Sequence, residues 1–220
     1  MPDLSFRVES VEPVKHAAAP TLGFQLHIRN SPPEEAVHTI ALRCQIQLEV
    51  TRRRYLPTEQ ERLLDLFGEP ARWNQTLRNM LWTNTSLLVP AFAGSTVVDL
   101  QVPCTFDFNV AATKYFDGLS EGEVPLCLMF SGTVFHAGPT GALQAAPIPW
   151  DKETRYRMPV TVWKEMMEQY YPNTVWLALR RDVFDRLHRY KMSHGIPAWE
   201  QALESILELA EANAKECVRS

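Results

Sequence analysis

The chain has 220 residues, of which 45% are hydrophobic and 22% are charged, and its net charge at pH 7 is −4. These proportions are typical of a globular protein and exclude a disordered, collagen-like or coiled-coil chain. The mild negative charge argues against a nucleic-acid-binding protein, and the length is sufficient for folding without disulfides or structural metals.

Two alternating segments predict half-buried β-strands. In residues 22–28 an apolar side chain occupies every second position, and in residues 40–50 six apolar residues alternate with mostly polar ones. A shift of one residue would expose the whole apolar row of the second segment, so we expect its register to be firmly set. The turn over residues 30–35, which contains two prolines, is expected to join these strands as antiparallel neighbours.

A helical insertion is predicted near residues 58–79. Thr58 and Glu61 have the spacing of a capping box, and leucines and a phenylalanine give the segment an apolar face. Asp107 is placed to cap a further short helix over residues 108–117. Additional strand patterns cover residues 81–89 and 95–104.

The strand predicted over residues 124–135 is apolar on both sides. Most of its apolar residues share one face, but Cys127, Met129 and Phe135 fall on the other. A strand of this kind needs cover on both faces. We expect the second cover to be a helix, the insertion or another subunit.

From residue 159 onward the apolar period becomes helical. Helices are predicted before Pro172, over residues 181–193, and after Pro197, the last with four glutamates on its outer side. The predicted fold is therefore α+β. It is a mostly antiparallel β-sandwich over residues 1–158, followed by a helical C-terminal segment over residues 159–220 that packs on it.

Histidines and cysteines do not form a ligand pattern. His27 and His38 border the turn between two strands and would approach each other there, but spacing supplies no third ligand. We therefore expect no metal and no cofactor. Cys44 and Cys104 continue apolar rows and are expected to be buried and inert, Cys127 lies on a strand expected to be covered, and Cys217 is expected to be exposed. Patterns for a nucleophile elbow, a dinucleotide turn, a phosphate loop or a zinc helix are not found, so no catalytic residue is assigned.

The candidate partner-binding residues are Arg52, Arg53, Arg54, Trp73 and Trp82. The three arginines follow a strand end, where they would grip a carboxylate or phosphate, although a solvated run of charge has the same appearance. Tryptophan is common at the energetic centres of interfaces, but both tryptophans would equally fill a core.

Several long strings carry a resemblance to a known family. They are IALRCQIQ at residues 40–47, RRRY at 52–55, LDLFGEP at 64–70, PCTFDFNVAA at 103–112, FSGTVF at 130–135, and the tail from 163 to 191. Together they resemble an uncharacterised bacterial family often encoded beside actinobacterial-type, oxygen-tolerant nickel–iron hydrogenases. The resemblance implies a non-catalytic accessory or assembly role, with a hydrogenase subunit or maturation factor as the partner. It supplies no catalytic residues.

A second class of function stays open. The chain would then be an enzyme or a small-ligand-binding protein with a pocket between the sandwich and the helices, and Arg52–Arg54 at its rim. The start of the chain lacks the basic and apolar regions of a signal peptide, and its apolar runs are far shorter than the ~20 residues of a membrane helix. We therefore expect a cytoplasmic protein without membrane insertion; a homo-oligomer is compatible with the sequence.

Overall fold

The protein is an α+β sandwich, as predicted. The computed structural model describes residues 2–107, 109–138 and 140–218, without the side chains of residue 213 and residues 215–218. These residues contain eight strands in antiparallel pairs and seven α-helices. The strands are β1 (Asp3–Pro13), β2 (Thr21–Ser31), β3 (Val37–Leu48), β4 (Met80–Val89), β5 (Ser95–Pro103), β6 (Glu123–Ala137), β7 (Leu143–Pro147) and β8 (Glu153–Pro159). The helices are α1 (Pro57–Arg62), α2 (Leu64–Phe67), α3 (Trp73–Thr76), α4 (Val110–Gly118), α5 (Val160–Tyr170), α6 (Arg181–Ser193) and α7 (Trp199–Val218), with 3-10 turns η1 (Val50–Arg52) and η2 (Pro70–Arg72).

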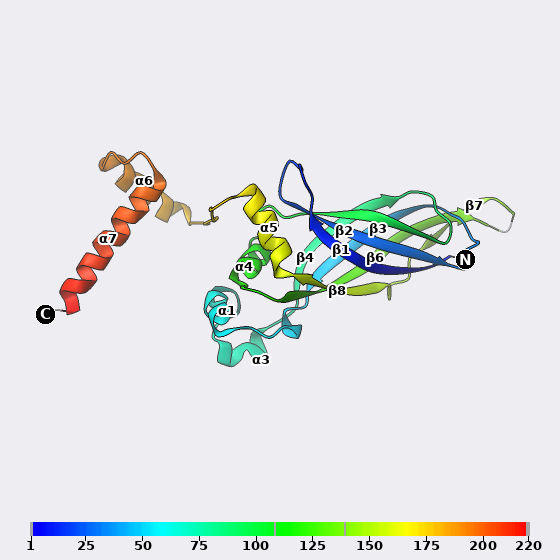
Figure 1. Ribbon diagram of the computed structural model, residues 1–220, viewed down its shortest axis with the longest axis horizontal. Coiled ribbons are helices and arrows are strands. Elements are labelled where there is room, and N and C mark those ends of the chain that lie inside the picture. The colour runs from blue at the N-terminus through cyan, green and yellow to red at the C-terminus, as the bar shows by residue number, and fades with distance from the viewer. Residues whose placement is uncertain (1, 108, 139, 219–220) are drawn as a thin grey trace. The chain divides into compact units, whose positions relative to one another are not determined.

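Two sheets pack face to face around one core. The first has strand order β1-β2-β5 and the second β4-β3-β6-β7, with β8 also paired to β6 (Figure 1). Phe6 of β1 stacks on Phe130 of β6 with ring centroids 4.1 Å apart, and Phe24 of β2 meets Trp82 of β4 edge-on at 6.2 Å. Aromatic side chains thus fill the space between the layers. In Figure 1 α4, α5 and the insertion lie at one end of the sandwich, and the N-terminus and β7 at the other.

The strands read from alternation are confirmed, and one was missed. In β3 the apolar row from Ile40 to Leu48 is buried while Ala41 and Arg43 are exposed. Strand β1 was not predicted, although its buried residues alternate with exposed ones in the way that marks the other strands.

The connection between β2 and β3 differs from the prediction. It carries the chain from one sheet to the other, so the two strands are not hydrogen-bonded neighbours. Asn30 holds this crossover, because its buried side-chain amide donates to the carbonyl oxygens of Pro32 and Glu35 at 3.2 and 2.7 Å. His27 and His38 consequently lie in different sheets, not opposite each other on adjacent strands.

Because one face of β3 is buried and the other is exposed, a change to aspartate should affect stability very differently on the two faces. Cys44 is 1% exposed, and burial raises the pKa of its thiol to about 12. We expect Cys44→Asp to lower the free energy of unfolding by about 3 kcal/mol or more, because it buries a carboxylate among apolar side chains. Ala41→Asp, on the exposed face of the same strand, is the matched control and should cost far less. Urea denaturation of both variants measures the difference, and equal losses would contradict the assigned phase.

Cys127 lies on the second face of β6. At this position, side chains of the neighbouring strands cover that face. This residue is 5% exposed and lies opposite Gln47 of β3 and Arg155 of β8. Its thiol donates to a carboxylate oxygen of Glu153 at 3.7 Å. Long polar side chains thus provide, at this position, the cover that we had expected from a helix or a subunit.

The insertion and α4 form where predicted but begin differently. Helix α1 starts at Pro57, which has no N–H to satisfy, and Glu59 accepts a hydrogen bond from the Leu56 N–H at 3.1 Å. The expected Thr58–Glu61 box is therefore replaced by a cap two residues earlier. Asn109, not Asp107, caps α4 by accepting from the Ala112 N–H at 3.0 Å. The predicted helix start at residue 108 lies outside the described residues.

The chain divides into two compact units, Met1–Thr174 and Val175–Ser220. Helix α5 belongs to the first unit, where it packs on β1, β8 and α4, and buries Val160, Trp163 and Met166. The division therefore falls after α5, whereas the change of period placed it at residue 158. Packing of the remaining helices on the sandwich stays a prediction. Among the described residues, no helix has both the length and the hydropathy needed to cross a membrane.

Candidate functional site

The three adjacent arginines separate at the end of β3. Arg53 is in an extended conformation, which turns its side chain away from those of its neighbours. Its side chain is 7% exposed, whereas that of Arg52 is 56% exposed and Arg54 lies on the surface. The structure thus corrects the assignment of Arg53 to a partner surface: it is a buried structural residue.

Arg53 forms a buried ion pair with Glu59 of α1. Its Nη2 atom lies 2.7 Å from Glu59 Oε1, and the Glu59 side chain is fully buried. The guanidinium also donates to the carbonyl oxygens of Glu121 and Glu123, at 2.6 and 2.7 Å. Gly122 allows this close approach: its φ is +78°, and a Cβ there would lie 3.3 Å from Arg53 Nη1. Arg53 therefore fastens the insertion to the turn before β6.

Glu59 receives two further contacts that stabilise its charge. It accepts from the N–H groups of Ser120 (2.7 Å) and Leu56 (3.1 Å), in addition to Arg53. Burial acts to raise the pKa of Glu59, but these hydrogen bonds and the arginine charge outweigh it and lower the pKa below its ordinary value. The pair is therefore charged at neutral pH.

Two tyrosines extend this network into the core. The Tyr55 hydroxyl donates to the Val50 carbonyl at 2.7 Å and accepts from the Tyr115 hydroxyl of α4 at 3.1 Å. The Arg53 guanidinium lies 5.7 Å from the centroid of the Tyr55 ring. Burial raises the pKa of Tyr115 to about 12 and raises that of Tyr55 as well, so both hydroxyls stay protonated at neutral pH.

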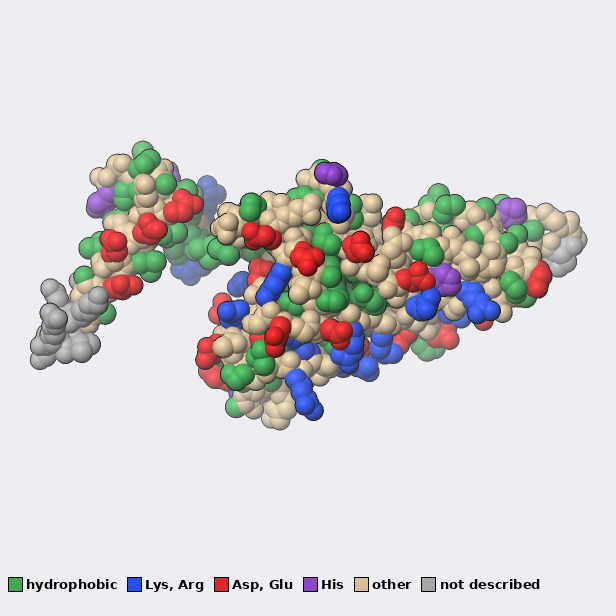
Figure 2. Space-filling model, in the orientation of Figure 1, with side chains coloured by type: hydrophobic (Ala, Val, Ile, Leu, Met, Phe, Trp, Pro, Cys, Tyr) green, Lys and Arg blue, Asp and Glu red, His purple; other side chains and the backbone are tan. Residues whose placement is uncertain are grey.

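An open cleft of about 520 Å³ lies above the ion pair, and we call it the arginine cleft. It is lined by Arg52, Arg53, Arg54, Leu56, Glu59, Glu121, Gly122, Glu123 and Arg157. Arg157 Nη1 is 3.9 Å from Glu123 Oε2, and Arg52 Nε is 3.4 Å from Glu49 Oε1. Both signs of charge therefore meet at this surface, and Figure 2 shows basic side chains mixed with acidic ones on the lower flank of the first unit.

Glu49 continues the charged surface toward β8. Its carboxylate also accepts from Arg155 Nε at 3.3 Å, and Arg155 pairs with Glu153 at 2.8 Å. Burial and the neighbouring Glu153 raise the pKa of Cys127, which lies beneath this group. A thiol in this environment is a poor nucleophile at neutral pH.

Trp73 and Trp82 are core residues, which corrects their assignment as interface anchors. They are 7% and 3% exposed. The Trp73 ring meets Tyr55 and Phe67 edge-on, and its Nε1 donates to the Gly68 carbonyl at 2.8 Å. Trp82 packs on Phe116 of α4, so the two tryptophans tie the insertion and α4 to the sandwich.

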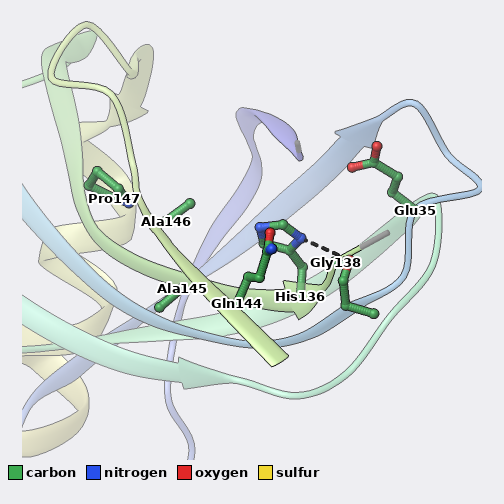
Figure 3. A pocket seen from close by; sticks show the side chains of 8 residues that line it. Glu35, His136, Gly138, Gln144, Ala145, Ala146 and Pro147 are labelled. Atoms are coloured by element: carbon green, nitrogen blue, oxygen red, sulfur yellow. Dashed lines mark hydrogen bonds between the residues drawn. The ribbon is translucent and has the colours of Figure 1, made fainter. Parts of the chain in front are cut away.

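A second cavity of about 610 Å³ lies near β7 and is lined by Glu35, His136, Gln144 and small residues (Figure 3). His136 and Gln144 face each other across β6 and β7, and in this view Glu35 lies apart from them, on the segment before β3. His136 Nδ1 donates to the Ala137 carbonyl at 3.1 Å, which leaves Nε2 as an acceptor in the neutral ring. This arrangement can hydrogen-bond a polar molecule.

Within the described part of the chain, no three His, Cys, Asp or Glu side chains converge to hold a metal ion. Cys44, Cys104 and Cys127 are free and buried. The side chain of Cys217 is outside those that the structure describes.

A family model matches residues 1–215, which is nearly the whole chain. The chain belongs to DUF6084, a family of unknown function. Membership of DUF6084 confirms that the family is uncharacterised, as the resemblance indicated. A search of curated proteins gives no match.

Three solved structures of other proteins share a distant likeness with this member of DUF6084. A solution structure of a candidate late embryogenesis abundant protein has 14% identity and a TM-score of 0.34, over 72% of each chain. A candidate ApaA protein from Bordetella pertussis has 11% identity and a TM-score of 0.28, over 71% of this chain and 94% of its own. β-Glucosidase 3B from Thermotoga neapolitana, solved with α-D-glucose, has 12% identity and a TM-score of 0.25, over 71% of this chain and 17% of its own.

Sequence reasoning missed the residues that make the arginine cleft a defined site. Glu59, Tyr115 and the turn at Glu121 come from separate parts of the chain, and only the fold brings them to Arg53. One signal was present: Arg53 and Tyr55 are two residues apart, the spacing of side chains on the same side of an extended segment.

Proposed function

We propose that the protein is a non-catalytic accessory or assembly protein that binds a nickel–iron hydrogenase subunit or a maturation factor. The resemblance to proteins encoded beside such hydrogenases suggests the identity of the partner. The observation that carries the proposal is the arginine cleft, where Arg52, Arg54 and Arg157 are exposed on a base fixed by Arg53 and Glu59. The same proposal assigns the protein to the cytoplasm and involves no nucleic acid.

A fixed set of guanidinium groups suits a protein partner. Arginine binds carboxylates in a planar, bidentate manner, and less entropy is lost when its backbone is already ordered. Because Glu121 and Glu123 line the same cleft as the arginines, the complementary partner surface presents carboxylates to Arg52 and Arg54 and a cation to the glutamates. A mixed pattern of this kind favours specificity over general attraction.

The variant Arg52→Ser/Arg54→Ser tests this surface without disturbing Arg53. We expect it to keep the melting temperature of the native protein, because exposed arginines contribute little to stability. Recovery of hydrogenase subunits or maturation factors in affinity purification from the native cell should fall. The difference from the native protein should be largest at low salt and should shrink as salt is added, because screening weakens the native arginine contacts as well.

Arg7→Ser/Arg29→Ser is the matched control. It removes the same charge from exposed positions on β1 and β2, in the other sheet. This control should recover the partner as the native protein does. Equal recovery of the partner with both double variants at every salt concentration would show that the arginine cleft is not part of the interface.

The alternative is an enzyme or small-ligand-binding protein, and the position of the arginine cleft is the observation in its favour. The cleft lies between α1 and the strands β6 and β8, as a pocket between sandwich and helices requires. Three guanidinium groups at its wall suit a small anion. Saturable binding of inorganic phosphate that Arg54→Ser abolishes would support this alternative over a protein partner.

A further inference from the structure

The second unit, residues 175–220, buries little of its own apolar surface. Of its described side chains only Ala202 is buried. Large side chains of both helices are exposed, among them Phe184 at 44%, Met192 at 63% and Leu207 at 61%. Two short helices without a core are not stable in water by themselves, so these apolar faces need cover.

Helix α6 covers only the beginning of α7. Phe184 packs on Trp199 with ring centroids 5.3 Å apart, and the Tyr190 hydroxyl lies 3.0 Å from the Ser205 hydroxyl. Leu203 and Leu207, which lie on one side of α7, are 38% and 61% exposed. The described part of α7 therefore presents an apolar face, on the side of Leu203 and Leu207, that α6 of the same chain does not cover.

Carboxylates border this face of α7. Leu203, Leu207 and Ala210 are spaced i, i+4 and i+7, which places them on one side of the helix. Glu200, Glu204 and Glu211 fall beside that row, and residues 199–212 contain no basic side chain. Figure 2 shows acidic side chains along α7 with hydrophobic ones between them. The occupant that fits is an amphipathic helix with basic side chains beside its apolar face.

Helix α6 has this chemistry. It carries Arg181, Arg186, Arg189 and Lys191 against two aspartates, and Met192 is 63% exposed on it, whereas Phe184 already packs on Trp199 of its own chain. A single unit thus offers both an acidic apolar helix and a basic apolar helix. Surfaces that are complementary to each other within one chain are those that a twofold symmetric dimer uses, because each contact then occurs twice.

We propose that the second unit is a dimerisation element, in which α6 of one copy packs against the exposed face of α7 of a second copy. The leucines of α7 become buried against α6, and the arginines of α6 lie opposite the glutamates of α7. This inference goes beyond the proposed function and uses a different surface, so loss of dimerisation and loss of the hydrogenase partner are separate results.

A charge exchange tests the proposal on the full chain. One variant, Glu200→Lys/Glu204→Lys/Glu211→Lys, makes both helices basic; the other, Arg181→Glu/Arg186→Glu/Arg189→Glu, makes both acidic. By analytical ultracentrifugation we expect the native protein to be a dimer and each variant alone to dissociate at least about tenfold more readily. An equimolar mixture should form a heterodimer, because every α6–α7 contact then joins opposite charges.

Rescue by mixing distinguishes a second copy from other occupants. Loss of folding in either variant would prevent rescue, so circular dichroism of each variant is recorded first, and Leu207→Asp provides a second, single-site disruption. Leu143→Asp, at a 66% exposed leucine of β7, is its control and should remain dimeric. A monomeric native protein, or folded charge variants that stay monomeric when mixed, would overturn the proposal.

Discussion

Replacing Arg53 by methionine should lower the free energy of unfolding by about 3–5 kcal/mol, because it leaves the fully buried carboxylate of Glu59 without its cation. The carbonyl oxygens of Glu121 and Glu123 lose donors in the same variant. Arg54→Met is the matched control, and we expect it to change stability by no more than about 0.5 kcal/mol because its side chain is exposed. Urea denaturation at neutral pH measures both.

The same ion pair makes stability depend on pH with a defined sign. The pKa of Glu59 is lowered on folding, so its stabilising contribution is complete above the ordinary carboxyl value of 4.5 and is lost as the pH falls through the lowered pKa. Glu59→Gln should remove this part of the acid dependence. An Arg53→Met protein within about 1 kcal/mol of the native protein would show that the pair is not important for the fold.

We expect Gly132→Ala to lower the free energy of unfolding by at least as much as Arg53→Met does. The reason is a steric collision between two strands. Gly132 of β6 has φ +137°, and a Cβ there would lie 2.0 Å from the Ala41 carbonyl oxygen of β3. The two strands are paired at this point, with Gly132 opposite Leu42, so neither backbone can move without breaking the sheet. We expect a loss of about 4 kcal/mol or more, or failure to fold.

Gly141→Ala is the control for this second prediction. Its φ of +78° is also in the left-handed region, but nothing lies within 4 Å of a Cβ at that position. We expect a cost of about 1–2 kcal/mol, that of left-handed backbone alone. Thermal or urea denaturation of both variants separates backbone strain from collision, and similar losses would contradict the close approach of β3 and β6.

The sequence was sufficient for elements whose burial is decided along the chain itself. The alternation of β3 and the helical period of α5 and α6 were visible because one face of each element repeats in sequence. The crossover after β2 was not visible, because a turn rich in proline looks the same whether it joins neighbours or changes sheet. The Thr58–Glu61 box was a reasonable cap, but Pro57 and the buried Glu59 favoured an earlier start.

The candidate site was predictable only in part. Three consecutive arginines predict one exposed cluster, and Arg52 and Arg54 do lie on the surface. Arg53 is buried because its acceptors, at Glu59 and on the turn at Glu121–Glu123, reach it through the fold. Trp73 and Trp82 could not be assigned from the sequence either, because tryptophan is typical both of an aromatic core and of an aromatic interface.

The insertion lies between two strands that are already hydrogen-bonded neighbours. Because β3 and β4 pair directly from Ile40 to Leu48, the chain that leaves β3 returns beside it, and the ladder does not depend on what intervenes. We therefore expect residues 50–76 to open as a separate cooperative unit while the sandwich stays intact, at the cost of the contacts that Leu63 and Trp73 make with the core. In native-state hydrogen exchange, amides of α1–α3 would share one opening free energy, lower than that of β3 and β6. The Arg53–Glu59 pair contributes to that opening free energy together with the buried Trp73, so a contact with the turn before β6 affects the local dynamics of the segment.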